Sequence, residues 1–388
     1  MPPPLRGVRV LELGQYIAVP GAAQILADQG ATVIKVEAPG GEPARLLPGY
    51  GAAMVQAYNR NKTCVELDLK SAVGLENARR LALSCDVVLA NFRPGALERL
   101  GLDAEALRSI RPDLVHLSFT GFGAEGSLRS RAGLDIAAQA ESGIMWVTGA
   151  ADGEPQRVGF PVVDAAATHV VAQAASAALL GRAAHGTGAS IQISLWDVAL
   201  TLQAANWMEY ALTGVEPVRT GNGQPSAAPA AELIEVADGW VVLSAYTPQH
   251  WRRLCELIGA EHLFDDPRFA TSLDRVRHRP ALHAEMARVF SSMDRAEVVS
   301  MLNGAGLVCG SVNSYGEAKA LRDTQPRSPF VSVSAPGDED PEWQLGPVAQ
   351  WWDDVGEPVP VKTSGFDNDR LDDLLSAPTD PEPLRSHS

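Results

Sequence analysis

One aspartate in the middle of the chain has the residue type and the setting for covalent chemistry. Asp164 follows a Gly-x-Pro turn and two β-branched residues, and it stands at the head of an Ala-rich apolar segment. One interpretation is a helix N-cap, because the carboxylate can accept backbone N–H bonds and meets the positive end of the helix dipole. The other is a nucleophilic carboxylate held at the mouth of a pocket. Its type and position alone leave both interpretations open.

Composition narrows the class of protein. The chain has 388 residues, enough for a large core and two domains, and its formal net charge of -15 argues against nucleic-acid binding. The four cysteines form no Cys-x-x-Cys pair, which favours reduced thiols, a cytoplasmic protein and no metal site. The N-terminus lacks the features of a signal peptide, and we expect no membrane span, because no segment reads as sufficiently long and apolar.

The first two hundred residues alternate between strand and helix patterns. Apolar strand patterns lie at 8–13, 31–37, 86–91, 114–119 and 190–195, and 59–70 combines a basic turn with an alternating strand. Strands separated by helices predict βαβ units, a parallel sheet and the α/β class. Glu37 ends the second strand where a ribose-binding acid would lie. A dinucleotide site is nevertheless disfavoured, because Gly14 is followed by Gln15 and Tyr16 rather than by a Gly-x-Gly-x-x-Gly turn.

The second half of the chain has a different pattern. A helical segment covers 196–214, and Asp238 and Gly239 form a hairpin-type turn between two strand patterns. Helical segments then follow to about residue 302, which indicates a smaller α+β domain. We expect a large domain over 1–200, a linker over 201–225, the small domain over 226–310, and a return to the large domain over 311–388.

An ordered set of motifs resembles the class III CoA-transferase family, also called CaiB/BaiF-type, which includes formyl-CoA and carnitine CoA-transferases and α-methylacyl-CoA racemases. The matching segments lie at 26–37, 59–62, 65–70, 91–96, 118–123, 135–140, 159–164, 191–195 and 238–240. Each segment alone is a weak signal. Their order over most of the chain, up to about residue 312, makes the resemblance specific.

The resemblance implies a fold and a mechanism. The family has a Rossmann-like large domain whose parallel sheet is built from both chain ends, a smaller α+β domain, and an interlocked homodimer. Asp164 falls on the family's catalytic aspartate, which attacks an acyl-CoA thioester to give a mixed anhydride and then an aspartyl-CoA thioester. The substrates would be an acyl-CoA and a carboxylic acid, with no permanently bound cofactor. A carboxylate suits this role, because it ionises without a neighbouring base.

The resemblance also implies contacts to CoA and a loop that covers the site. The positions matching the family's CoA contacts are Gln15, Tyr16, Ala18, Arg45, Lys70, Asn91, Phe92 and Arg99. Gly221 and Gly223 match a Gly-rich loop that covers the family's active site, in a shortened form. The alternative for these two glycines is a plain interdomain turn.

One departure from the family separates transfer from racemisation. Racemases of this superfamily carry a proton-transferring His just before the Asp-Ile motif, and this chain has Leu134 there. His116 and His169 are the nearest alternatives in sequence, and we interpret both as structural. We therefore favour CoA transfer, with a racemase or a non-catalytic acyl-CoA-binding protein as alternatives. Four residues are candidates for an apolar acyl site, namely Trp146, Trp207, Met208 and Tyr210.

Overall fold

The computed structural model describes residues 3–223, 231–245, 247–333, 342–347, 362 and 364–376. The chain divides into two units. The first comprises Met1–Ile144, Val158–Met208 and Ser328–Ser388, and the second comprises Met145–Arg157 and Glu209–Arg327. Both ends of the chain thus belong to the first unit. The structure places 145–157 in the second unit and the return to the first unit at Ser328, whereas the sequence suggested a return at 311.

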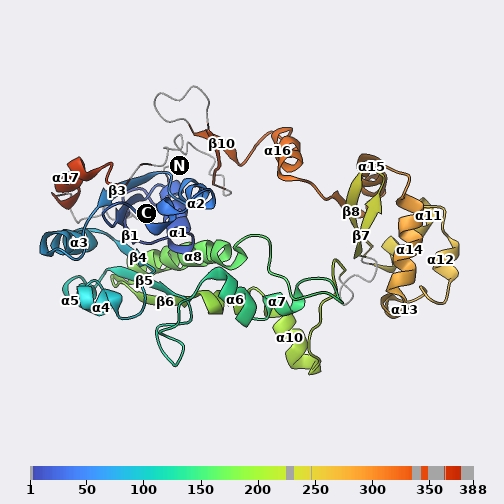
Figure 1. Ribbon diagram of the computed structural model, residues 1–388, viewed down its shortest axis with the longest axis horizontal. Coiled ribbons are helices and arrows are strands. Elements are labelled where there is room, and N and C mark those ends of the chain that lie inside the picture. Colours follow the sequence, from blue (N-terminus) through green and yellow to red (C-terminus); the bar gives the residue numbers. More distant parts are fainter. Residues whose placement is uncertain are drawn as a thin grey trace. The chain divides into compact units, whose positions relative to one another are not determined.

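A six-stranded parallel sheet forms the centre of the first unit (Figure 1). In spatial order its strands are β3 (Lys62–Glu66), β2 (Thr32–Glu37), β1 (Arg9–Leu13), β4 (Val87–Ala90), β5 (Val115–Thr120) and β6 (Ser190–Ser194). The order 3-2-1-4-5-6 is that of doubly wound folds, which bind ligands beyond the carboxyl ends of their central strands. The predicted α/β class and the predicted strand segments are confirmed.

Helices cover both faces of this sheet. One face carries α1 (Ala18–Asp28), α6 (Asp135–Glu141), α8 (Val162–His185) and α9 (Leu195–Thr201). The other carries α3 (Ala72–Ser84), α4 (Ala96–Leu100), α5 (Ala104–Ile110) and α17 (Leu371–Ser376). Successive strand residues alternate between the two cores, so that Val10 packs into the first and Leu11 into the second. Because both faces are covered, the strands read as continuous apolar runs.

A smaller apolar cluster lies beside α1. It contains residues of η1 (Pro43–Leu46) and α2 (Tyr50–Tyr58), packed around Ile17. The helical segment predicted for 196–214 is interrupted after α9, and α10 (Ala204–Thr213) follows as a separate helix. Helix α6 ends at Glu141, and the short helix α7 (Ile144–Val147) begins after Gly143.

The C-terminal segment returns to the first unit without adding a strand to the parallel sheet. Its described strands, β10 (Phe330–Val333) and β11 (Glu342–Leu345), pair with each other in an antiparallel ribbon. At the edge of β3, the backbone N–H groups of Cys64 and Glu66 donate to the side chains of Asp367 and Asn368, at 2.9 and 2.8 Å. Asn368 begins the short helix η2 (Asn368–Arg370).

The expectation of a parallel sheet built from both chain ends is therefore wrong for the described residues. The N-terminal half of the chain supplies all six strands, from Arg9 to Ser194. The C-terminal segment reaches the edge of the sheet through one backbone bond, from Asp367 N–H to the Cys64 carbonyl at 3.0 Å, and through two side chains that occupy donors an added strand would need.

The second unit is built on a three-stranded antiparallel sheet. β7 (Ala231–Val236) and β8 (Gly239–Ser244) form the predicted hairpin, and β9 (Val308–Ser311) pairs with the other edge of β8. Residues 308–311 thus belong to this sheet and do not return the chain to the first unit, because β8 offers them an open edge. The helices are α11 (Pro248–Leu257), α12 (His262–Asp265), α13 (Ser272–Arg277), α14 (Arg279–Phe290), α15 (Arg295–Gly304) and α16 (Tyr315–Asp323).

The long helix α8 is apolar enough to cross a membrane by length and composition alone. The prediction that no segment reaches this length and apolarity is therefore wrong. In the structure one face of α8, which includes Ala167, Val171 and Ala175, is buried against the sheet and α1. Core packing thus accounts for the apolar character of that face.

Gly21 allows α1 and α8 to approach each other closely. A Cβ at Gly21 would lie 2.4 Å from Thr168 Cγ2 and 3.1 Å from Tyr58 Cδ1. We expect Gly21→Ala to lower the free energy of unfolding by about 1–3 kcal/mol, the usual cost of overpacking. The matched control is Gly181→Ala in α8, where the new methyl group would meet nothing within 4 Å. We expect this control to raise the free energy by about 0.5–1 kcal/mol, and equal effects in urea unfolding would contradict the close approach.

Candidate active site

Asp164 is the third residue of α8 and lies in its first turn. The N-cap position is occupied by Pro161, and no side chain of α8's own N-terminus caps the helix. The capping interpretation of Asp164 is therefore wrong, because the helix begins at Val162, three residues before the start that an N-cap at Asp164 would give. Its side chain is partly buried, and within the described residues its carboxylate accepts no hydrogen bond. Both carboxylate oxygens are thus available to a ligand.

Asp135, the first residue of α6, holds the backbone of this turn. Its Oδ1 accepts the N–H groups of Val163 and Asp164, at 2.8 and 3.1 Å. Gln139, one turn later in α6, donates from Nε2 to Oδ2 of Asp135 and accepts the N–H of Val158 at 2.9 Å. Asp135 thereby satisfies two of the N–H groups that a helix start leaves open. A neighbouring helix thus fixes the position of the Asp164 backbone.

The electrostatic setting of Asp164 differs from that of a surface carboxyl group. Burial raises the pKa of Asp164 to about 7, and the negative charge of Asp135 adds to the shift. At neutral pH the side chain is therefore present in both forms. Perturbed pKa values of this kind are typical of functional sites.

The carboxyl ends of β1 and β4 meet at a second part of the site. Gln15 N–H donates to Asn91 Oδ1 at 3.0 Å, and Asn91 Nδ2 donates to the Gln15 carbonyl at 2.8 Å. The next residue, Tyr16, has a φ of 66° and donates its N–H to Glu42 Oε2 at 2.9 Å. A non-glycine residue in this region stores about 1–3 kcal/mol of strain. The hydrogen bonds therefore hold a loop conformation that the sequence would not adopt alone.

A buried ion network lies next to this loop. Glu12 pairs with Lys35 through Oε1 at 2.7 Å and with Lys62 through Oε2 at 2.6 Å, and Lys35 also lies 3.5 Å from Glu42 Oε1. These four side chains are at most 2% exposed. Burial alone would raise the pKa of Glu12, but the two ammonium groups outweigh it and hold that pKa below its ordinary value. Through Glu42 the network connects the sheet to the strained Tyr16.

A comparison of the sequence with known families shows to which family the chain belongs. The model described as CoA-transferase family III matches residues 5–356. The chain belongs to CoA-transferase family III. The resemblance inferred from the sequence motifs is thereby confirmed, and the protein is an enzyme of this class.

The relatives of this family III CoA-transferase span most of its length. It is 39% identical over 326 residues to the probable fatty acyl-CoA transferase Rv3272 of Mycobacterium tuberculosis, covering 79% of this chain and 81% of the relative. It is 35% identical over 344 residues to a succinate–glutarate CoA-transferase of Agrobacterium fabrum, covering 86% of both chains. A crystal structure of a CaiB/BaiF family protein from Brucella suis has a TM-score of 0.86 at 31% identity, covering 97% of this chain and 100% of that one.

The basic residues predicted to contact CoA lie in two kinds of setting. Arg45 donates from Nε and Nη2 to both carboxylate oxygens of Glu37, at 2.7 and 2.8 Å, so most of its donors are engaged. Lys70 and Arg99 are exposed. The guanidinium of Arg99 lies over Gly95, where a Cβ would come within 3.2 Å of its Nη1. Lys70 and Arg99 are thus better placed than Arg45 to meet a phosphate group.

The apolar residues predicted around the site also differ in exposure. Ala18 is buried at the start of α1, and Phe92 is partly buried against the core on the opposite face. Leu134, directly before Asp135, is 63% exposed. Of the two histidines considered as proton carriers, His116 is buried with Nε2 on the Leu102 carbonyl at 3.0 Å.

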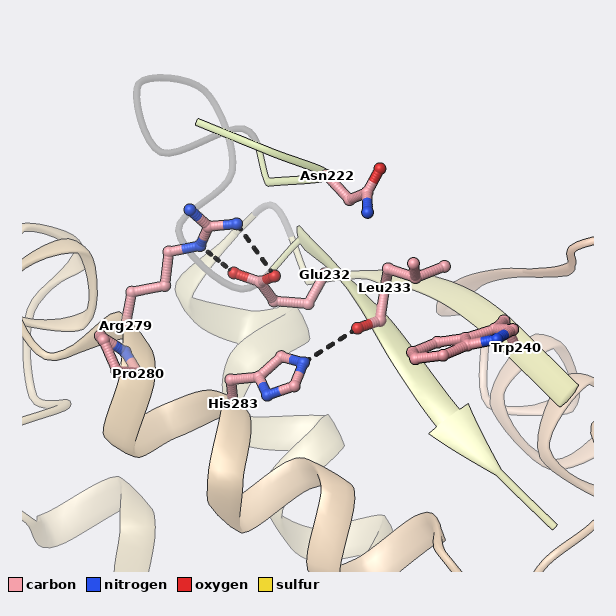
Figure 2. A pocket seen from close by; sticks show the side chains of 7 residues that line it. All are labelled: Asn222, Glu232, Leu233, Trp240, Arg279, Pro280 and His283. Atoms are coloured by element: carbon pink, nitrogen blue, oxygen red, sulfur yellow. Dashed lines mark hydrogen bonds and ion pairs between the residues drawn. The ribbon is translucent and has the colours of Figure 1, made fainter. Parts of the chain in front are cut away.

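The predicted covering loop belongs to the second unit and is fixed there by α14. Arg279 pairs with Glu232 of β7 (Figure 2) and donates from Nη1 to the Thr220 carbonyl at 2.8 Å. A Cβ at Gly223 would lie 2.1 Å from Arg279 Nη2, so a larger residue would displace this guanidinium, whereas Gly221 has open space around it but a φ of 62° that favours glycine. A cavity of about 390 Å³ opens here, lined by Asn222, Glu232, Leu233, Trp240, Arg279, Pro280 and His283.

Sequence reasoning missed three residues that the structure brings into the site. Asp135 and Gln139 lie four residues apart, a spacing that places them on one helix face, and this was the available signal. Glu42 stands between two turns and carried no signal. The sequence did not reveal that the start of α6 meets the start of α8.

Proposed function

We propose that this family III CoA-transferase moves CoA from an acyl-CoA to a second carboxylic acid through covalent intermediates on Asp164. One observation carries the proposal. Asp164 presents a partly buried carboxylate that no described donor occupies, on a backbone fixed by Asp135, with a pKa near neutrality. Relatives named for CoA transfer to glutarate, oxalate and D-citramalate support the substrate class.

The reaction balances through four substitutions at carbonyl carbon. Ionised Asp164 attacks the acyl-CoA thioester, the C–S bond breaks, and a mixed anhydride and CoA thiolate form. The thiolate attacks the aspartyl carbonyl, which gives an aspartyl-CoA thioester and releases the donor acid as its carboxylate. The acceptor carboxylate attacks this thioester to form a second anhydride and CoA thiolate. Attack of the thiolate on the acceptor's acyl carbon yields the new acyl-CoA and restores the Asp164 carboxylate.

This route places two demands on the site. Each tetrahedral oxyanion needs hydrogen-bond donors, which are worth about 3–4 kcal/mol each in acyl-transfer enzymes. The anhydrides need protection from water, because hydrolysis would waste the activated acyl group. We assign the second role to the loop of Gly221 and Gly223. No ATP is required, because every intermediate remains activated.

For CoA itself we assign the loop at the carboxyl ends of β1 and β4. Gln15, Tyr16 and Asn91 form this loop, and ligands of doubly wound sheets bind at such an edge. Lys70 and Arg99 would offset the charge of the CoA phosphates in a chain whose net charge is -15. Ala18, Phe92 and Arg45 would contribute by packing and by support of the loop.

A homodimer of the interlocked kind is part of the proposal. Helix α10 buries no residue within its own chain, and it exposes Trp207, Met208 and Leu212. A second copy would cover this apolar surface, and part of it would line the acyl site. Light scattering tests this, because a monomer at micromolar concentration would contradict it. We retain the cytoplasmic location as part of the proposal.

A racemase is the alternative from the same superfamily. Proton exchange at the acyl Cα needs an acid/base group on each face of the substrate, and Leu134 cannot carry a proton. A racemase would exchange solvent deuterium into a 2-methylacyl-CoA. A non-catalytic binding protein would show no turnover, and it would keep its acyl-CoA affinity in Asp164→Ala.

The direct test is a transfer assay over a matrix of acyl-CoA donors and carboxylic acid acceptors. Mono- and dicarboxylates from two to sixteen carbons form both sides of the matrix, with new acyl-CoA measured by chromatography and mass spectrometry. We expect formation of acceptor-CoA to equal loss of donor-CoA, without ATP. Donor consumption without acceptor-CoA would instead indicate a thioesterase.

The pH dependence of this reaction follows from the raised pKa of Asp164. Only the ionised carboxylate attacks, so we expect kcat/KM for the acyl-CoA to rise about tenfold per pH unit below pH 7 and to level off above it. The acceptor acid reacts only after Asp164 has been acylated, so its ionisation does not affect kcat/KM for the acyl-CoA. Circular dichroism at each pH controls for unfolding. A profile that stays flat between pH 5 and pH 8 would contradict an Asp164 pKa near 7.

A further inference from the structure

Asp135 contributes a second carboxylate close to the reacting one. We propose that Asp135, locked in place by Gln139, is a positioning residue for CoA transfer, which aims Asp164 through its backbone and drives its acylation by charge repulsion. This inference rests on the proposed function of Asp164.

The first part of the argument is the hydrogen bonding. Pro161 supplies no side-chain acceptor to the N-terminus of α8, so the first-turn N–H groups depend on Asp135. Asp135 is 7% exposed and Gln139 is fully buried, which leaves neither side chain room to turn toward solvent. The N–H of Val163 and the N–H of Asp164 share one oxygen, Oδ1. A movement of Asp135 would therefore move the backbone that carries the nucleophile.

The second part is the charge balance along the reaction. Asp164 is anionic before attack and neutral once it is an anhydride or a thioester. The negative charge of Asp135 therefore repels the starting state of Asp164 more than the acylated states. An interaction that disfavours only the starting state lowers the barrier to acylation. It also makes the ionised Asp164 more basic and hence more nucleophilic.

The other titratable groups near α8 are accounted for. The pKa of Tyr58 in α2 is raised, chiefly by burial and next by Tyr50. The nearby carboxylate of Asp164 makes a smaller contribution to this shift. Of the remaining side chains on packed elements, Asp28 in α1 pairs with Arg60, and Asp197 in α9 accepts from Ser194 Oγ at 2.6 Å. His116 in β5 is engaged with a backbone carbonyl, and His169 in α8 itself points to solvent. Asp135 is the described group whose charge acts on Asp164.

The decisive variant is Asp135→Asn, which keeps an oxygen acceptor for the two N–H groups and removes the charge. The matched control is Glu141→Gln, which also removes a carboxylate from α6. Glu141 pairs with Arg131 and does not bind the α8 backbone. We expect Asp135→Asn to move the acid limb of the kcat/KM profile down by about 0.5–1 pH unit and to lower kcat on the plateau about tenfold, with little change in KM for the acyl-CoA. Glu141→Gln should leave the profile in place.

Asp135→Ala removes both the acceptor and the charge. We expect it to lower kcat about 100-fold, because the nucleophile is then misplaced as well as less basic. Should Asp135→Asn unfold because its amide faces Gln139, the acid limb of the Asp135→Ala profile tests the loss of charge instead, and it should move down by the same amount. Superimposable profiles for wild type and Asp135→Asn, or an equal shift in Glu141→Gln, would overturn the inference.

A folding measurement separates failure of this inference from failure of the proposed function. At pH 8, Asp164→Asn should raise the urea midpoint of the wild type more than that of Asp135→Asn, because the repulsion is already gone in the second background. Equal increases in both backgrounds would overturn the inference without any assay. An enzyme that transfers no CoA yet shows this coupling would contradict the proposed function and leave the interaction of the two carboxylates standing.

Discussion

Asp164→Asn will abolish CoA transfer without harming the fold. The amide is a poor nucleophile and cannot ionise, so we expect kcat to fall by a factor of about 10³ or more. Binding of CoA, measured by calorimetry, should change little, because the proposed CoA contacts lie on the loop at β1 and β4. Asp265→Asn in α12, where the side chain is exposed, is the matched control and should keep wild-type activity. Retention of more than a few per cent of the activity in Asp164→Asn would contradict a covalent role.

The same substitution should stabilise the protein in a pH-dependent way. The folded-state pKa of Asp164 is raised above its unfolded value, so its favourable contribution is fully present below the unfolded pKa and is lost as pH rises through about 7. At pH 8 the wild type carries the cost of a partly buried charge, and Asp164→Asn does not. We expect the variant to be more stable by roughly 2 kcal/mol at pH 8, with the difference shrinking toward pH 5.

Glu12→Gln will give the largest loss of stability. Glu12 is the shared counter-ion of Lys35 and Lys62, and all three side chains are fully buried. Its replacement leaves Lys62 without a carboxylate partner and Lys35 with only the more distant Glu42, and breaking a buried ion pair costs about 3–5 kcal/mol in comparable cases. We expect urea unfolding at pH 7 to show this loss, with a disturbed Tyr16 loop and weaker CoA binding.

The control for this prediction is another glutamate made neutral in the same unit. Glu76→Gln in α3 removes an exposed carboxylate, and it should change the free energy of unfolding by less than about 0.5 kcal/mol. Replacing all the charged residues of the buried network by apolar ones would be a different experiment, because it would leave no unpaired charge behind. A loss below 1 kcal/mol in Glu12→Gln would show that Lys35 and Lys62 find other partners.

The strands of the sheet were predictable because each one is marked by a short pattern in its own sequence. Each strand is a short apolar run bounded by turns, and a parallel sheet covered on both faces requires such runs. The order of the motifs identified the family, and most of these motifs lie at or beside the ends of the parallel strands. The hairpin at Asp238 followed from a two-residue turn between strands.

The candidate site was predictable in Asp164 and in the loop residues Gln15, Tyr16 and Asn91, but not in the residues that support them. Asp164 was found from its motif, but its first-turn position was missed because helix boundaries depend on packing beyond the local sequence. Asp135 accepts from residues 28 and 29 positions away and Gln139 from one 19 positions away, and nothing local indicates that their helix meets α8. Glu42 likewise binds Tyr16 over 26 positions. Long-range hydrogen bonds of this kind arise from the tertiary fold and leave no pattern in the sequence.

Trapping the enzyme during turnover tests the covalent account most directly. The protein is mixed with a panel of acyl-CoAs, treated with borohydride or hydroxylamine, and examined by intact-protein mass spectrometry and peptide mapping. We predict a CoA adduct, or its reduced or hydroxamate product, on Asp164 and none in Asp164→Asn. Efficient transfer of CoA with no modification of Asp164 at any donor would contradict the account.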